Sequence, residues 1–99
     1  MRIIEKNLDK IVALCKKHKV SKLFVFGSIL TNEFKKSSDI DLMVDFADVD
    51  LSNYADNYFE LKYSLEELFD RPIDLLEEKA INNPYFKKTV DSTKLLIYG

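Results

Sequence analysis

Two acidic residues, Asp39 and Asp41, lie two positions apart in a segment where apolar and polar residues alternate. Such alternation is typical of a strand, on which residues two apart project from the same face, roughly 6–7 Å apart at the backbone. Two carboxylates on one face repel each other and lose solvation, and a divalent cation relieves both costs. Hard cations such as Mg²⁺ bind carboxylate oxygens and keep positions for water or phosphate. The apolar face would consist of Ile40, Leu42, Val44 and Phe46, and the other face of Asp39, Asp41, Met43 and Asp45.

A glycine and a serine, Gly27 and Ser28, are separated from Asp39 by ten residues. They follow the apolar run Leu23–Phe26, which is typical of a buried strand. Glycine permits backbone angles that other residues avoid and lets a ligand approach the main chain. We expect the next residues, Ile29–Phe34, to form one or two helical turns, whose free N–H groups would bind an anion such as phosphate. A phosphate site facing a metal site is what nucleotide chemistry needs.

A third aspartate, Asp74, is the only polar residue in the predicted strand 73–76. If this strand lies beside that of Asp39 and Asp41, Asp74 shares their face. Taken alone, an edge-strand aspartate that faces water is an equally good interpretation, but the Gly-Ser turn and the aspartate pair favour the functional one. Lys35 and Lys36, in the loop before Asp39, either reach toward a polyphosphate or only solvate the loop, and the sequence does not separate these alternatives.

Helices must position these strands. The spacing of apolar residues predicts an amphipathic helix over residues 2–18 and a longer one after the polar break at 48–52. The pair Asn83-Pro84 predicts the start of a third helix. His18 has no second ligand at metal spacing, so we expect a surface histidine. Tyrosines in the long helix could stack on a base, although a tyrosine stripe at helical spacing more often belongs to a core. That stripe comprises Leu51, Tyr54, Tyr58, Leu61, Leu65 and Leu68.

The totals bound the class of protein. A chain of 99 residues predicts one domain, and 46% hydrophobic residues suffice for a core. The net charge of −2 disfavours non-specific binding to nucleic acid. The single cysteine excludes an internal disulfide, and we see neither a signal peptide nor an apolar run of membrane-spanning length. We therefore expect a cytoplasmic protein that binds no membrane.

Taken together, Gly27-Ser28, the ten-residue spacer, Asp39-Ile40-Asp41 and a later strand with Asp74 resemble the nucleotidyltransferase superfamily that includes DNA polymerase beta. The short length looks like its minimal nucleotidyltransferase (MNT) branch. The resemblance implies one α/β domain over residues 1–99, a small mixed β-sheet with helices packed against it. It implies two Mg²⁺ ions held by Asp39, Asp41 and Asp74, and transfer of a nucleoside monophosphate from a triphosphate to an acceptor hydroxyl. Asp74 would help to activate that hydroxyl, and Gly27 and Ser28 would hold the phosphates.

MNT proteins of this kind commonly act as antitoxins of a helical HEPN toxin, an RNase, and some transfer AMP to a tyrosine of that toxin. The resemblance therefore implies ATP as donor, a HEPN toxin as partner in a hetero-oligomer, and no direct binding of nucleic acid. Many members have arginine soon after the serine, where this chain has Ile29, Leu30 and Thr31. Lys35, Lys36 or a partner would then neutralise the pyrophosphate. Two alternatives stay open: a module that neutralises its partner by contact alone, and a transferase for a small molecule such as an aminoglycoside.

Overall fold

The computed structural model describes residues 2–31, 34–35 and 37–99. Four strands form one mixed sheet in the order β3-β2-β1-β4, with β2 antiparallel to β1 and parallel to β3, and β4 antiparallel to β1. This confirms the predicted α/β fold with a small mixed sheet. The strands are β1 (Val20–Phe26), β2 (Ile40–Phe46), β3 (Ile73–Glu77) and β4 (Leu95–Tyr98).

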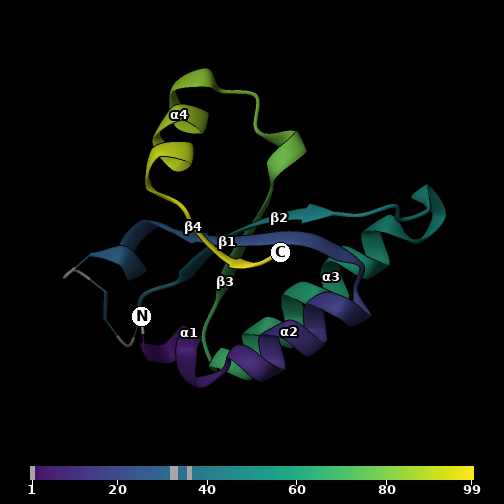
Figure 1. Ribbon diagram of the computed structural model, residues 1–99, viewed down its shortest axis with the longest axis horizontal. Coiled ribbons are helices and arrows are strands. Elements are labelled where there is room, and N and C mark those ends of the chain that lie inside the picture. Colours follow the sequence, from purple (N-terminus) through teal and green to yellow (C-terminus); the bar gives the residue numbers. More distant parts are fainter. Residues whose placement is uncertain (1, 32–33, 36) are drawn as a thin grey trace.

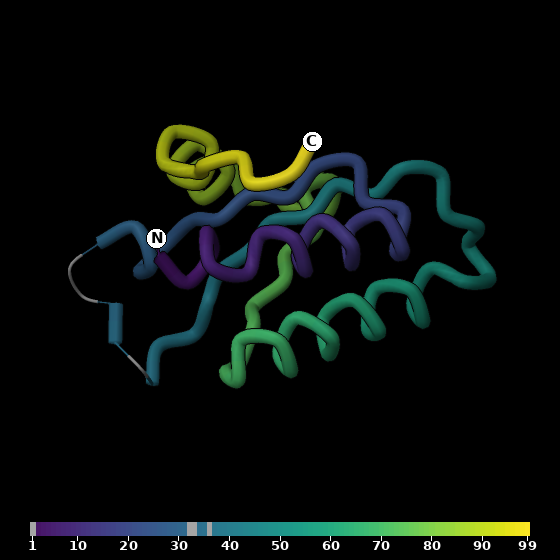
Figure 2. The backbone as a smooth tube through the Cα atoms, turned by 60° about the horizontal axis from the view of Figure 1, so that its bottom comes forward, coloured from purple at the N-terminus to yellow at the C-terminus, as the bar shows by residue number. Residues whose placement is uncertain are grey.

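The helices cover the two sides of the sheet unequally. Figures 1 and 2 show α1, α2 and α3 on one side and α4 on the other. Parallel strands need a crossover connection, and α3 supplies it between β2 and β3. The helices are α1 (Arg2–Lys6), α2 (Leu8–Lys17), α3 (Leu51–Phe69) and α4 (Pro84–Thr93), with short 3₁₀ helices η1 (Gly27–Leu30) and η2 (Glu78–Ala80).

Local side-chain bonds explain where several helices begin and end. The predicted helix over residues 2–18 is divided into α1 and α2 at Asn7, whose side chain donates a hydrogen bond to the Ile3 carbonyl at 2.8 Å. The predicted cap of α4 is confirmed, because the Asn83 side chain accepts hydrogen bonds from the N–H groups of Tyr85 and Phe86. The segment after Ser28 is shorter than predicted, a single 3₁₀ helix that ends at Leu30.

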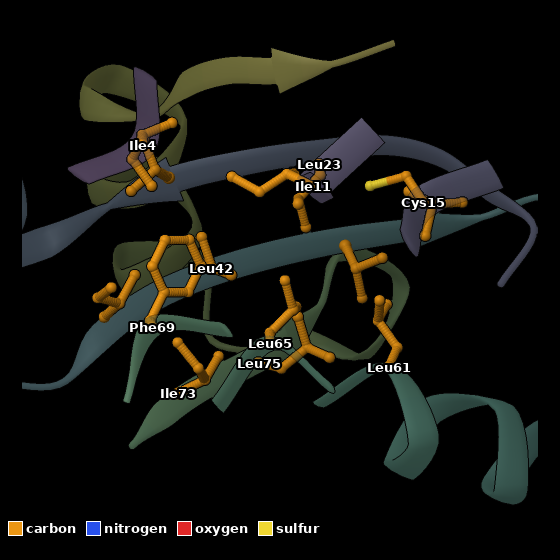
Figure 3. Packing of buried hydrophobic residues seen from close by; sticks show 14 of the residues in the cluster. Ile4, Ile11, Cys15, Leu23, Leu42, Leu61, Leu65, Phe69, Ile73 and Leu75 are labelled. Carbon is orange, nitrogen blue, oxygen red and sulfur yellow. The ribbon is translucent and has the colours of Figure 1, made fainter. Parts of the chain in front are cut away.

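The main core lies between the sheet and α1–α3 (Figure 3). Its buried side chains come from both long helices and three strands: Ile11, Cys15, Leu61, Leu65, Phe69, Leu23, Leu42, Ile73 and Leu75. A smaller cluster of Phe26, Met43 and Val90 lies beneath α4 on the opposite face. Met43 was predicted on the polar face of its strand, and it is on that face, but α4 covers it. Strand β2 is therefore apolar on one face and mixed on the other.

Three predictions about single side chains had different outcomes. His18 is 2% exposed, so its predicted surface position is wrong, because the turn into β1 folds it against α3, where Asn57 donates a hydrogen bond to its carbonyl. Leu51 begins α3 fully outside the core, 92% exposed. Tyr54 and Tyr58 are half-buried and donate hydrogen bonds to Glu77 and to the Leu75 carbonyl, which confirms their role in packing. No helix in the described ranges is long and apolar enough to cross a membrane.

Candidate active site

Three side chains form a row across one face of the sheet. Phe26 of β1 lies directly opposite Asp41 of β2, and Asp41 lies directly opposite Asp74 of β3. Side chains of directly opposed residues project from the same face. This face is the one beneath α4, because Phe26 belongs to the small cluster with Val90. The condition set for Asp74 is therefore met: its strand lies beside that of Asp41, and the two carboxylates share a face.

Gly27 permits the close approach of the Asp41 carboxylate to the main chain. Its φ of +80° belongs to the left-handed region, and a Cβ atom added there would lie 2.2 Å from Asp41 Oδ2. The main-chain N–H of the next residue, Ser28, donates a hydrogen bond to the same carboxylate. The Gly-Ser turn thus fixes the Asp41 carboxylate in place. The Ser28 carbonyl in turn accepts from the Thr31 N–H and hydroxyl, which closes η1.

Burial and neighbouring charges both change the pKa of Asp41. Burial raises the pKa of the Asp41 carboxyl group above its usual value, and the negative charges of Asp74 and then Asp39 raise it further. The hydrogen bond from Ser28 N–H opposes this rise only in part. Asp74 and Asp39 therefore lie close enough to Asp41 to disfavour its ionised form. A cation at this place would relieve that cost.

The donor chemistry of these residues fits magnesium. Asp39 and Asp74 are exposed and Asp41 is half-buried, so all three offer hard carboxylate oxygens at the surface. Within the described ranges, no group of three or more His, Cys, Asp or Glu side chains is placed to hold a metal ion. That is compatible with Mg²⁺, which usually binds one or two carboxylates and completes its octahedron with water and substrate phosphates. It does not fit an ion that needs a closed protein cage.

Arg71 is not among the predicted site residues, yet it contacts the loop that leads into Asp39. Its Nη1 donates hydrogen bonds to the carbonyls of Lys35 and Ser38, both at 3.1 Å. Its guanidinium lies 4.6 Å from the centre of the Phe34 ring. Arg71 thus ties the loop that leads into Asp39 to the segment just before β3. Its position just before the predicted Asp74 strand was a usable signal, but nothing in the sequence indicates which loop it contacts.

The two lysines predicted to bind phosphate are not brought to the row by any described contact. Lys35 is exposed, and its main-chain N–H donates to the Ser38 hydroxyl at 3.0 Å. Within the described part of the chain, no contact links its ammonium group to the three aspartates. Lys36 lies outside the described residues. Phosphate binding by these two lysines stays a prediction.

A cavity of about 530 Å³ lies at the opposite end of β2 and contains none of the predicted site residues. Its polar lining is mostly acidic: Asp45, Asp48, Asp50, Glu77, Tyr54 and Lys79. Lys79 Nζ lies 3.5 Å from Asp45 Oδ1 across it. Because β2 runs from Asp41 at one end to Asp45 near the other, this cavity is separate from the site around Asp41 and Asp74.

Known protein sequences match most of this chain. The family model described as polymerase beta, nucleotidyltransferase matches residues 9–99. MJ1379 of Methanocaldococcus jannaschii, a candidate protein adenylyltransferase, is 35% identical over 94% of this chain and 98% of its own length. MJ0128 of the same organism, with the same description, is 39% identical over 86% of this chain and 82% of its own.

Solved structures show the same fold. A candidate minimal nucleotidyltransferase superposes with a TM-score of 0.76 at 25% identity, covering 93% of this chain and 90% of that one. A chain of a toxin–antitoxin complex with AMP-PNP superposes with a TM-score of 0.72 at 25% identity, covering 94% of this chain and 73% of that one. A chain of the MntA–HepT toxin–antitoxin complex superposes with a TM-score of 0.66 at 26% identity, covering 96% of this chain and 72% of that one.

Proposed function

This chain belongs to the polymerase beta nucleotidyltransferase family and, within it, to the minimal nucleotidyltransferases, and from that premise we propose that it transfers AMP from ATP to a tyrosine hydroxyl of a HEPN-type toxin. The modified toxin would be inactive, so the chain would act as its antitoxin. The observation that carries this proposal is the row of Asp41 and Asp74 beside the Gly27 turn.

Asp39, Asp41 and Asp74 would hold two Mg²⁺ ions. When bound, the ions would stabilise charge on the attacking and leaving oxygens of an in-line displacement. In that displacement the tyrosine oxygen bonds to the α-phosphorus, the bond from the α-phosphorus to the bridging oxygen breaks, and pyrophosphate leaves.

The chain's own residues have distinct tasks in this scheme. Ser28 N–H and the absence of a side chain at Gly27 keep the Asp41 carboxylate against the turn, where it is partly shielded from water. Asp74 is exposed on the same face, so its carboxylate can reach an incoming acceptor and take the proton of the tyrosine hydroxyl. Asp39 extends the acidic row toward the loop held by Arg71.

The partner and donor are supported by relatives. Two curated relatives are described as candidate protein adenylyltransferases, and they align with 86% or more of this chain. Two structural neighbours belong to toxin–antitoxin complexes, one of them with AMP-PNP. A protein acceptor and an adenine nucleotide donor are the combination that accounts for both observations.

A labelling experiment tests the proposal. The purified chain, the product of the neighbouring gene and Mg²⁺ are incubated with ATP labelled at the α- or the γ-phosphate. We expect the label to reach the partner from α-labelled ATP only, at a tyrosine identified by mass spectrometry. The variant Asp39→Asn/Asp41→Asn should transfer none, whereas Asp45→Asn, on the same strand at its other end, should transfer normally. Transfer that persists in the double variant would refute the proposed site.

One observation favours a second candidate, an antitoxin that acts by contact alone. Where many relatives have arginine after the serine, this chain has Ile29, which is 7% exposed and belongs to the main core. A buried isoleucine cannot neutralise pyrophosphate. If the double aspartate variant restores growth of toxin-producing cells as well as the wild type does, contact suffices and turnover is dispensable.

A further inference from the structure

One aromatic ring beside the carboxylate row is only half covered. Phe86, in the first turn of α4, meets Phe26 edge to face, with ring centroids 6.4 Å apart and an interplanar angle of 75°. Phe26 is 7% exposed, whereas Phe86 is 42% exposed. The Phe86 ring therefore contacts the sheet through Phe26 and leaves much of its surface open to solvent.

The place of this ring follows from the pairing of the strands. Phe26 immediately precedes Gly27 and lies opposite Asp41, which lies opposite Asp74. The Phe86 ring thus stands at the β1 end of the row, next to the Gly-Ser turn. In Figures 1 and 2, α4 lies toward the end of the sheet at which β1 passes into η1.

We propose that Phe86 is the surface on which the nucleobase of the triphosphate stacks, an inference that rests on the proposed function. A nucleotide whose phosphates bind between the Gly27 turn and the carboxylates has its base one ribose away. In that neighbourhood Phe86 offers an aromatic face that no described residue covers fully. Stacking of a base on an aromatic side chain is favourable for every base, because every base has a π-face.

The backbone under this ring is fixed before any ligand arrives. The Asn83 side chain accepts hydrogen bonds from the N–H groups of Tyr85 and Phe86, at 2.9 and 3.2 Å. One turn later, Val90 is 2% exposed and anchors α4 on Phe26 and Met43. A ring held in this way loses little conformational freedom on binding, which favours affinity.

The surface around this ring is polar along α4 and apolar on β4. The exposed residues of α4 that follow Phe86 are polar, whereas the exposed leucines Leu95 and Leu96 belong to β4. Tyr85 projects roughly 100° away around the helix and is 83% exposed, so it is much less covered than Phe86. A single ring that contacts the sheet beside the Gly-Ser turn matches one flat ligand.

The test compares two ligands that share the phosphate chain and differ in the nucleoside. Dissociation constants of ATP and of inorganic tripolyphosphate are measured by calorimetry in Mg²⁺ for the wild type and for Phe86→Ala. We expect ATP affinity to fall by roughly tenfold and tripolyphosphate affinity to stay the same, since alanine removes only the stacking contact. Phe86→Trp should restore ATP affinity. Tyr85→Ala is the matched control and should change neither value.

Each outcome decides. Phe86→Leu keeps an apolar contact with Phe26 but has no π-face. It should therefore lose ATP affinity and keep tripolyphosphate affinity, and it serves as the test if the alanine variant folds poorly. Equal losses for both ligands in Phe86→Leu would mean that the ring only supports the fold, and the inference would be wrong. Unchanged ATP binding in that variant would also overturn it, and the proposed function would survive. Failure of the wild type to bind either ligand would refute both.

Discussion

The two faces of strand β2 differ in what they contact and in what they contribute. The face toward α2 and α3 presents Ile40, Leu42 and Val44, each at most 1% exposed. The face toward α4 presents Asp41, then the covered Met43, then Asp45. Neighbouring residues of one strand thus have different surroundings, because successive side chains point to opposite faces.

This difference separates stability from chemistry. Burial of apolar side chains on the first face favours the folded state by about 25 cal/mol for each Å² removed from water. On the second face, burial and neighbouring charges raise the pKa of Asp41, so its ionised form costs stability at neutral pH. We expect substitutions on the first face to change the free energy of unfolding and substitution of Asp41 on the second face to change catalysis. Four predictions test this division.

The largest effect is expected for Asp41→Asn. The amide cannot hold a cation as a carboxylate does, so AMP transfer should fall by about 10³-fold or more. The free energy of unfolding should stay the same or rise, since the substitution removes a charge that burial disfavours. Labelling of the partner and urea denaturation measure the two quantities. A variant that loses activity because it unfolds would break the division between the faces.

Leu65→Ala should show the reverse. Leu65 is fully buried in the main core, so truncation removes apolar contacts and leaves a cavity. We expect the free energy of unfolding to fall by about 2–5 kcal/mol. Activity per folded molecule, measured well below the melting temperature, should match that of the wild type. Exposed Leu51, on the same helix, is the control, and its alanine variant should be as stable as the wild type.

Arg71→Lys should have a moderate effect on activity, because Arg71 holds the loop before Asp39. Lysine keeps the charge but loses the planar fork that binds the carbonyls of Lys35 and Ser38. Because the held loop leads into Asp39, we expect activity to fall by about tenfold, with a higher KM for Mg-ATP. Stability should change by about 1 kcal/mol, the net value of one such hydrogen bond. Unchanged kinetics would show that the loop needs no support from Arg71.

The smallest effect is a shift in the titration of Asp41. Asp74 raises the pKa of Asp41, so Asp74→Asn should lower it toward its usual value, and Asp45→Asn should leave it unchanged. The pKa of folded Asp41 lies above that of the unfolded chain. Its contribution to stability is therefore full below the unfolded pKa and is lost as pH rises through the folded pKa. NMR titration of the Asp41 carboxyl carbon in both variants measures the shift.

Sequence reasoning succeeded where the cause is local. The alternation around Asp39 and Asp41, the turn at Gly27 and the cap at Asn83 depend on a few neighbouring residues, and the structure has the strand, the positive φ and the capping bonds. It failed for His18, because burial of a single polar residue depends on which element packs over it. It missed Arg71 for the same reason, since the contacted loop lies 33 and 36 residues earlier in the chain.

By itself, the sequence determined the alternating strand that begins next to Asp39 and the glycine bend that precedes it, because the period of a strand and the conformational freedom of glycine are properties of the local chain. Only the tertiary structure decided that Asp74 lies directly opposite Asp41 and that Phe86 contacts Phe26. The register of two strands joined through α3, and the face on which α4 lies, are set by burial of residues far apart in the chain.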